Sequence, residues 1–457
     1  MNRFPPEIIS RIARCFMCEN PTEDMGSMIP LTHVCRYWRE SIISTPGNWT
    51  RISSKSKGLA ALSLQRAKAA PLEICLDMRQ VRESPGFSDL IGPHIQNVGT
   101  SRIDHISTIE EFTQTLPNFP QSIPSLRSLV LVSEPGYPNW DWSVEPVGLL
   151  SPALTHLSLR SIDLYPPFPH LRTLTDLSLQ YNGFNLHLDI LLDFFEGNRL
   201  LERADLKIRF TEPSLRNSRR RAAIMNRLQS LTVASVDAMD SNALISNIAL
   251  QKGAHLTMTL YNRNAGLDDL LSVISMTHLS NLQSPTRMEY HPDRRTIRLL
   301  GPNGSLSFVA RGLENPFPRL PPPCITDVQT FRLVRRPTRS QTNDIIFSPS
   351  SLPALETLVI ECEVTLSHLF STLFSNPPSS PRLKTIAFLD CDLDEDFMKE
   401  LTQFAFNRKN TASAWLYRVV IINSKGILRR FACIDALGRY VPVVDVRVGK
   451  ELPADLM

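Results

Sequence analysis

Apolar residues return in a short, regular pattern along most of the chain. From about residue 120 onward the hexad Leu-x-x-Leu-x-Leu recurs, with looser copies in which Ala, Val, Phe or Ile replaces a leucine. The copies begin at Leu126, Leu154, Leu174, Leu201, Leu228, Val328, Leu355 and Leu383. Because side chains alternate between the two faces of a strand, each copy predicts a β-strand with its leucines on one face and its intervening residues on the other.

The spacing of these hexads predicts a stacked repeat. Successive copies are 28, 20, 27 and 27 residues apart, and the last three follow one another at 27 and 28 residues. A period of about 20 to 29 residues is typical of leucine-rich repeats, in which a short strand and a return segment form each unit and neighbouring units share one apolar core. A leucine-rich globular protein can produce such hexads by chance, but eight copies, with five of their seven steps between 26 and 29 residues, favour the repeat.

The residues between the leucines form a candidate binding surface. They project from the strands on the side opposite the core, which is the concave face of a repeat array. They are polar and of both charges, as suits a folded partner or a flexible segment, although such positions are solvated in any repeat protein. The candidate substrate contacts are His156, Ser158, Arg160, Asp176, Gln180, Asp205, Lys207, Arg332 and Glu361.

The array is interrupted for 100 residues after Leu228. Within this interval residues 256–260 alternate as in a further strand. Residues 296–309 predict two strands around the turn Gly301-Pro302-Asn303-Gly304, which is a β-hairpin inserted at about residues 290–312.

Two other regions carry weaker signals. After the last hexad, residues 416–422 and 427–434 predict a second hairpin and residues 440–448 a third strand, which together would cap the open end of the array. Between residues 55 and 120, residues 59–64 suggest a helix and residues 72–76 suggest the strand that begins the array.

The first fifty residues follow a helical period instead. Two runs of apolar residues predict two short amphipathic helices, joined by a polar connector at residues 19–24. Pro5 and Pro6 open the first run, where a helix tolerates proline. The apolar stripes are Ile8, Ile9, Ile12 and Phe16 in the first run and Leu31, Val34, Cys35, Trp38 and Ile42 in the second. So short a segment cannot bury all these side chains alone, so we expect it to need a partner surface.

Composition and charge narrow the class of protein. The 457 residues are 42% hydrophobic and 21% charged, which excludes a disordered chain. The 49 basic and 45 acidic residues give a net charge of +4, too balanced for nucleic acid or a membrane to be the main partner. The N-terminus lacks the apolar core of a signal sequence, so we expect a cytosolic or nuclear protein. Eight scattered cysteines are typical of reduced, mostly buried thiols.

Three motifs follow one another in order within about residues 3–52. They are Phe4-Pro5-Pro6-Glu7-Ile8-Ile9, then Leu31-x-x-Val34-Cys35-Arg36-x-Trp38-Arg39, then Thr45-Pro46-x-x-Trp49. This segment resembles an F-box, the docking module of cullin-based ubiquitin ligase receptors, in a form similar to that of mushroom-forming fungi. Phe4 stands where leucine is usual, and the connector between the first two helices is longer and more polar than in compact versions.

The resemblance implies a docking interface at the N-terminus. In that family the F-box binds an adaptor subunit that bridges to a cullin scaffold, and the following region captures a protein substrate. The residues implied in adaptor binding are Phe4, Pro5, Pro6, Ile8, Ile9, Ile12, Leu31, Val34, Cys35, Trp38 and Trp49. Leftover apolar surface on two short helices suits a helix groove, where a buried tryptophan is often worth about 2 kcal/mol. The alternative is that the bundle packs against the first repeat of its own chain.

Other chemistry has little support in the sequence. Cys15-x-x-Cys18 with His33 and Cys35 is a poor zinc set, because the alternate residues of a His-x-Cys pair rarely face one metal. The basic runs at residues 219–221 and 335–336 predict solvated faces. No glycine-rich phosphate loop or hydrolase motif is present. We therefore expect no catalytic residue, no metal and no cofactor.

Together these patterns predict an α+β or α/β protein, with a small N-terminal helical F-box bundle followed by an irregular leucine-rich-repeat horseshoe that carries a β-hairpin insertion. The expected segments are an F-box at 1–52, a connecting segment and first irregular repeats at 53–120, the array at 121–415 and a β capping segment at 416–457.

The predicted function is that of a non-catalytic substrate-recognition subunit of an SCF-type cullin-RING ubiquitin ligase, with an unknown protein as its substrate. Deleting residues 1–52, or combining Val34→Asp with Trp38→Ala, should abolish ligase association and leave substrate capture intact. The alternative is a stand-alone leucine-rich-repeat scaffold for protein interactions, which predicts no association with the adaptor.

Overall fold

The computed structural model of the chain describes residues 4–18, 28–84, 86–108, 114, 123–133, 151–162, 171–180, 187–209, 222–235, 238–261, 285–291, 296–310, 326–335, 352–362, 381–391, 393–410, 415–424 and 431–447. The expected connector at 19–24, the basic run at 219–221 and Arg336 lie outside these residues, as do the side chains of Phe16 and Cys18. Contacts divide the chain into a first unit, Met1–Arg219, and a second unit, Arg220–Met457.

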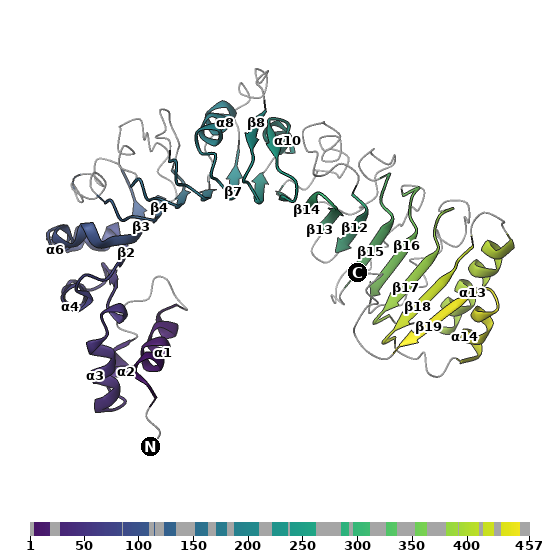
Figure 1. Ribbon diagram of the computed structural model, residues 1–457, viewed down its shortest axis with the longest axis horizontal. Coiled ribbons are helices and arrows are strands. Elements are labelled where there is room, and N and C mark those ends of the chain that lie inside the picture. The colour runs from purple at the N-terminus through teal and green to yellow at the C-terminus, as the bar shows by residue number, and fades with distance from the viewer. Residues whose placement is uncertain are drawn as a thin grey trace. The chain divides into compact units, whose positions relative to one another are not determined.

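The first unit begins with a helical bundle (Figure 1). The expected first helix is confirmed as α1 (Pro6–Cys18). The second apolar run was expected to form one helix, but it forms α2 (Ile29–Thr32) and α3 (Arg36–Ser44), followed by the short 3-10 helix η2 (Pro46–Asn48). The break occurs because Cys35 is extended, with φ −161°, and caps α3. Arg39 Nε donates to the Thr32 carbonyl at 3.0 Å, which holds the two short helices together.

A parallel sheet follows in the first unit. Seven strands of the described residues pair side by side in chain order, all parallel. The strands are β1 (Arg51–Ser53), β2 (Leu72–Asp77), β3 (Val98–Ile106), β4 (Ser128–Ser133), β5 (His156–Arg160), β6 (Asp176–Gln180) and β7 (Arg203–Ile208). The connecting helices are α4 (Lys57–Ala67), α5 (Met78–Glu83), α6 (Phe87–Ile91), η3 (Gly92–Asn97) and α8 (Leu188–Gly197). The expected helix at 59–64 and strand at 72–76 are confirmed within α4 and β2.

The second unit contains a longer ladder. Its strands lie in the spatial order β9, β11, β14, β13, β12, β15, β16, β17, β18, β19, and only β13 runs antiparallel to its neighbours. They are β9 (Ser230–Ser235), β11 (His255–Leu260), β12 (Arg287–His291), β13 (Thr296–Gly301), β14 (Gly304–Ala310), β15 (Thr330–Arg335), β16 (Thr357–Cys362), β17 (Thr385–Leu389), β18 (Arg418–Ile422) and β19 (Val443–Arg447). A separate pair, β8 (Ala223–Met225) and β10 (Ile248–Leu250), flanks α10 (Ala238–Ser246).

The expected insertion is confirmed and extended. β13 and β14 form the predicted hairpin, and Gly304 takes a φ of 148° at its turn. The sequence pattern missed β12, which pairs with β13. The hairpin is also part of the ladder, because β14 pairs with β11 and β12 pairs with β15, so the three strands are inserted in reverse order.

The expected second hairpin near the C-terminus is wrong. Residues Phe431–Gly438 form a helix, α14, and the third strand, β19, pairs parallel with β18. Parallel neighbours need a crossover rather than a tight turn, and a helix is the usual crossover. The helix α13 (Glu395–Asn410) makes the same kind of connection between β17 and β18.

The apolar hexads form the core of both units. All three apolar positions of all eight copies are buried, and the most exposed, Leu129, is 7% exposed. The inward placement of the apolar residues is therefore confirmed in every copy, but the intervening residues Ser158, Val359 and Ala387 are buried as well. We call the strand face that carries these residues the core face, and the opposite face the outward face.

Candidate functional site

The core of the N-terminal bundle is closed. Ile9, Ala13 and Ile42 are fully buried, and Met28 is 1% exposed. Ser10 Oγ donates to Asn48 Oδ1 at 2.7 Å, a bond that joins α1 to η2 inside this core. The bundle therefore has its own fixed interior, despite its small size.

Trp49 connects the bundle to the repeat region. Its side chain is 3% exposed, and its indole Nε1 donates to the Ile42 carbonyl at 2.9 Å. The guanidinium of Arg66, on α4, lies 4.2 Å from the centre of the Trp49 ring. Of the residues expected to contact the adaptor, Ile9 and Trp49 thus lie inside the chain, where they hold the bundle together and fix it to α4.

Other apolar side chains of the bundle lie uncovered. We define the docking set as Phe4, Ile8, Ile29 and Val34, which are 56%, 41%, 45% and 58% exposed. The Tyr37 hydroxyl donates to the Phe4 carbonyl at 3.0 Å, which brings the start of α1 against α3. The remaining residues of the expected interface are exposed (Pro5, Pro6 and Cys35) or half-buried (Ile12, Leu31 and Trp38).

Ile29 was missed by the sequence analysis. It belongs to the short helix α2, which ends at Thr32, so it is not on the stripe of a longer helix. The run Ile29-Pro30-Leu31 was the available signal, since proline in a first turn marks a helix that begins at this point.

The sequence makes Cys15, Cys18, His33 and Cys35 a poor zinc set, and the structure describes the side chains of all of them but Cys18. Cys15 and Cys35 are exposed free thiols, and among the residues that the structure describes no group of three His, Cys, Asp or Glu side chains suits a metal ion. The expectation that most thiols are buried is wrong for the described cysteines. Only Cys391 of these five is buried, while Cys75 and Cys433 are half-buried.

Seven of the expected substrate contacts share the outward face of the first unit. The strand registers align them in rows that cross β5, β6 and β7. The rows are His156, Asp176 and Arg203; Ser158, Ser178 and Asp205; and Arg160, Gln180 and Lys207. The surface is therefore a continuous polar strip, as the alternation of the hexads predicts.

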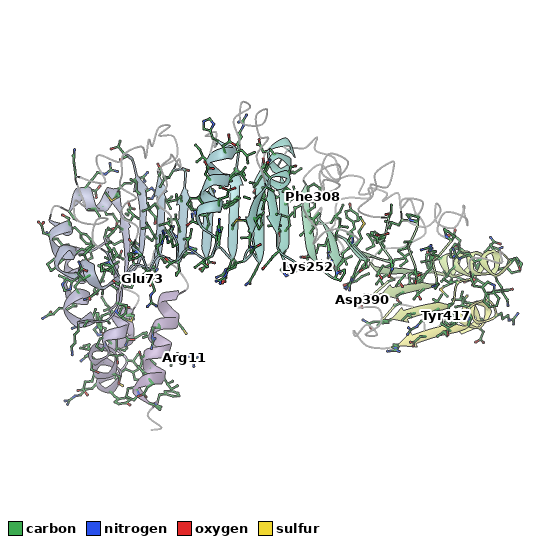
Figure 2. The ribbon with its side chains drawn as sticks, turned by 45° about the horizontal axis from the view of Figure 1, so that its top comes forward. Arg11, Glu73, Lys252, Phe308, Asp390 and Tyr417 are labelled. Atoms are coloured by element: carbon green, nitrogen blue, oxygen red, sulfur yellow. The ribbon has the colours of Figure 1, made fainter. Side chains whose placement is uncertain are left out.

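Charges on this strip neutralise one another. Arg203 forms an ion pair with Asp176, which also accepts a hydrogen bond from Thr175 Oγ1 at 2.8 Å. Desolvation raises the pKa of Asp205, and the positive charge of Arg160 opposes this shift. Towards the N-terminal end of the sheet, Arg51 Nε lies 3.7 Å from Oε1 of Glu73, which Figure 2 labels on β2.

The two expected contacts of the second unit lie in a charged cluster. Arg332 Nη2 donates to Glu361 Oε2 at 2.6 Å, and Arg332 Nη1 lies 3.7 Å from Glu289 Oε1. Arg287 Nη2 donates to the same Glu289 oxygen at 2.7 Å. We call these residues, with His291, the Glu289 cluster.

Glu289 is the centre of this cluster. Its side chain is 10% exposed, and its pKa is lowered to about 2. His291, whose Nε2 lies 3.8 Å from Glu289 Oε2, makes the largest contribution to this lowering of the pKa. The positive charges of Arg287 and Arg332 lower the pKa further, while desolvation raises it. The sequence analysis missed Arg287, Glu289 and His291, although their spacing of two residues is that of one strand face.

A second charged group lies at the far end of this ladder. Arg447 Nη2 donates to Asp445 Oδ2 at 2.7 Å, and Arg418 Nη2 donates to the same oxygen at 3.4 Å. The hydrogen bond from Arg447 is the main reason that the pKa of Asp445 is lowered. This group and the Glu289 cluster lie on the outward face, with β17 between Glu361 of β16 and Arg418 of β18.

An open groove separates α13 from α14. It is lined mainly by apolar atoms of side chains that include Met398, Phe406 and Cys433. The rings of Phe406 and Tyr440 meet edge to face, 5.3 Å apart, at this groove. The lining described there contains no acid and no histidine, so it offers no acid–base pair.

Within the described parts of the chain, no helix is both long enough and apolar enough to cross a membrane. No protein-family model matches this sequence. No curated protein matches it either.

Proposed function

We propose that this chain is a substrate receptor of a cullin-based ubiquitin ligase. In this proposal the N-terminal bundle is an F-box that docks on the adaptor subunit, and the two strand ladders are an irregular leucine-rich-repeat array that holds a protein substrate. The receptor does no chemistry on its own. It supplies binding and position, and a lysine of the substrate supplies the nucleophile.

The exposed docking set is the observation that carries the proposal. The bundle has a complete core of its own, yet Val34 is 58% exposed and Phe4 is 56% exposed. Apolar side chains of this size, grouped at the ends of short helices, mark a surface for a protein partner. Phe4, Ile8 and Val34 also fall within the motifs that resemble an F-box.

The proposal of a leucine-rich-repeat array is supported by the pairing of strands in the two ladders. The last two apolar residues of each hexad lie on the core face of one strand, and the strands of neighbouring hexads pair in parallel from β4 to β7 and from β15 to β17. A parallel stack with one strand in each repeat is the arrangement of leucine-rich repeats. The polar strip across β5, β6 and β7 is then the candidate substrate surface.

Positioning explains how such a receptor accelerates ubiquitin transfer. A substrate held on the array remains close to a conjugating enzyme bound on the same scaffold. Tethering of this kind gives effective concentrations in the range of about 1 mM, which converts an encounter between two molecules into a nearly intramolecular step. The buried Trp49 supports this role, because its contact with Arg66 packs the bundle directly against α4.

The test is association with the adaptor subunit. The full-length chain is co-expressed with the adaptor, and the captured fraction is compared with that of Val34→Asp and Ile8→Asp variants. We expect each variant to lower the affinity by about tenfold or more, since a charge is placed in an apolar contact. The control is Val446→Asp, which changes an exposed valine of β19 in the second unit.

Two results would contradict the proposal. The first is that the wild-type chain does not bind the adaptor, which would favour a stand-alone interaction scaffold. The second is that Val34→Asp and Ile8→Asp bind as well as the wild type. Circular dichroism of each variant checks that the bundle remains folded.

A further inference from the structure

The helices α13 and α14 of the second unit pack against the core face of its ladder. Figure 1 shows them on the same side of β17, β18 and β19. Phe388, on the core face of β17, meets Phe397 of α13 with ring centres 5.3 Å apart. The side of the helix pair that faces away from the sheet therefore remains available to other molecules.

The groove between the two helices lies on this surface. Met398, Thr402 and Phe406 line it from α13 at a spacing of four residues, which is one face of the helix over about 12 Å. The lining from α14 has small side chains, which are Ala432, Cys433 and Ala436. Because these side chains are short, the space between the helices stays open, with a volume of about 390 Å³.

Large apolar side chains at one end of the groove are uncovered. Phe406 is 39% exposed, although its ring meets that of Tyr440 edge to face. Trp415 is 53% exposed, and its indole Nε1 donates to the Lys409 carbonyl at 3.0 Å, so it lies at the end of α13. Exposed aromatic side chains beside an apolar groove indicate a surface for a protein partner.

The same end of the groove is positively charged. Lys409 Nζ donates to the Arg439 carbonyl at 3.0 Å and lies 5.7 Å from the ring centre of Tyr440, which lines the groove. Lys409 and Arg439 are both exposed, and neither forms an ion pair with a described residue. Two positive charges at this end are thus available to an acidic partner.

The other end of the groove carries more negative than positive charge among the described residues. Lys399 lines the groove there, and its Nζ lies 2.9 Å from Glu395 Oε1 and 3.5 Å from Asp396 Oδ1. Two carboxylates therefore surround one ammonium group. The groove is apolar along its length and opposite in charge at its two ends.

We propose that this groove binds an amphipathic α-helix of a partner protein, with acidic residues in the first turn of that helix beside Lys409 and Arg439. Apolar side chains three or four residues apart on the partner helix fill the space between α13 and α14.

The charges fix the direction of the bound helix. Acidic residues stabilise the first turn of a helix and basic residues the last turn. With its first turn beside Lys409 and Arg439, the partner helix runs antiparallel to α13 and α14. Its positive dipole end then meets the negative dipole ends of both helices, and its last turn meets Glu395 and Asp396.

A helix fits this groove better than a nucleic acid strand does. A single strand needs a row of cations that follows its phosphates. The lining of the groove is mainly apolar, and Lys399, the one cation in that lining, is already paired with acids.

This inference does not depend on the proposed function. The groove lies on the helix side of the second ladder, whereas the Glu289 cluster lies on its outward face. A partner helix and a ligand of that cluster therefore bind opposite faces of the same ladder.

The test measures the binding of two designed peptides to the full-length chain. Each has about 14 residues, or about 21 Å as a helix, with leucines at helical spacing and two lysines in its last turn. The first peptide has two glutamates in its first turn, and the second has glutamines there. By fluorescence anisotropy we expect the glutamate peptide to bind about three- to tenfold more tightly, since two exposed charge pairs are added.

Three variants locate this preference. In the variant that combines Lys409→Gln with Arg439→Gln, both peptides should bind equally, because the positive end is removed. Arg298→Gln is the matched control: it removes an exposed cation of β13 and should leave the preference unchanged. Ala432→Trp places a large side chain at an exposed position of the groove and should weaken both peptides by about tenfold or more.

Several outcomes would overturn the proposal. They are no binding of either peptide, equal binding of both to the wild type, and a preference that persists without Lys409 and Arg439. Tight binding of a labelled oligouridine in place of the peptides would identify a nucleic-acid surface instead. Circular dichroism checks the folding of each variant, and if Ala432→Trp does not fold, the glutamine variants decide the outcome.

Discussion

Arg332 and Glu361 lie on neighbouring strands and bind each other, with Arg332 Nη2 2.6 Å from Glu361 Oε2. Both were expected from the sequence to meet a substrate. Because each already has an ionic partner, a ligand that uses either side chain must compete with this pair. The pair is therefore part of the stability of the second unit as well as a candidate recognition element.

The energetic coupling of this pair can be measured by a double-mutant cycle. We expect Arg332→Met and Glu361→Gln to show a coupling of about 0.5 to 1 kcal/mol in the free energy of unfolding, as for a partly exposed ion pair. The measurement is urea denaturation of the two single variants, the double variant and the wild type. A coupling near zero would mean that Arg332 is held mainly by Glu289 instead.

The charge of Glu289 should make the stability of the protein depend on acid pH. Its pKa of about 2 in the folded chain is below its ordinary value of 4.5, so folding favours the ionised form. The stabilisation is then complete above pH 4.5 and is lost as the pH falls from 4.5 towards 2. The shift corresponds to at most about 3 kcal/mol.

This prediction is checked with Glu289→Gln. The difference in unfolding free energy between wild type and variant should be largest near neutral pH and should shrink below pH 4.5. Glu356→Gln is the matched control, since Glu356 forms a more exposed pair with Lys384 at 3.2 Å. A difference that stays constant with pH would contradict the role given to Glu289.

Replacing the buried Trp49 by alanine should lower the free energy of unfolding far more than replacing the exposed Trp415. Replacing Trp49 by alanine removes a buried ring, a hydrogen bond to Ile42 and the contact with Arg66, and we expect a cost of about 3 to 5 kcal/mol. Trp415 is 53% exposed, so Trp415→Ala should cost about 1 kcal/mol or less. Thermal denaturation followed by circular dichroism compares the two, and similar costs would contradict the buried joint.

Alanine substitutions at two glycines should change the stability of the protein in opposite directions. Gly304 has a φ of 148°, which an L-residue rarely adopts, so Gly304→Ala should destabilise the β13–β14 turn by about 1 to 3 kcal/mol. Gly58 lies in α4 with open space where a Cβ would be, so Gly58→Ala should stabilise by about 0.5 to 1 kcal/mol. Chemical denaturation measures both, and a stabilising Gly304→Ala would show that the turn relaxes.

Several features of the candidate sites could not be predicted from the sequence and were seen only in the structure. The second apolar run predicted one helix, but the extended backbone of Cys35 divides it and exposes Val34 between the parts. The resemblance to an F-box implied that Trp49 contacts the adaptor, yet its ring lies against Arg66 and its indole bonds the Ile42 carbonyl inside the chain. A linear motif indicates which residues are apolar, but only packing decides whether a given side chain faces the interior or solvent.

What the sequence determined by itself was the repeat. The positions of the hexads, the first helix and the β13–β14 hairpin follow from local periodicity and turn chemistry, which neighbouring residues encode directly. The tertiary structure decided which strands pair. It inserted β14, β13 and β12 in reverse order, made α14 a crossover where a hairpin was expected, and gathered Arg287, Glu289 and Arg332 into one cluster. These outcomes depend on contacts between residues far apart in the chain, and no local pattern of apolar and polar residues specifies them.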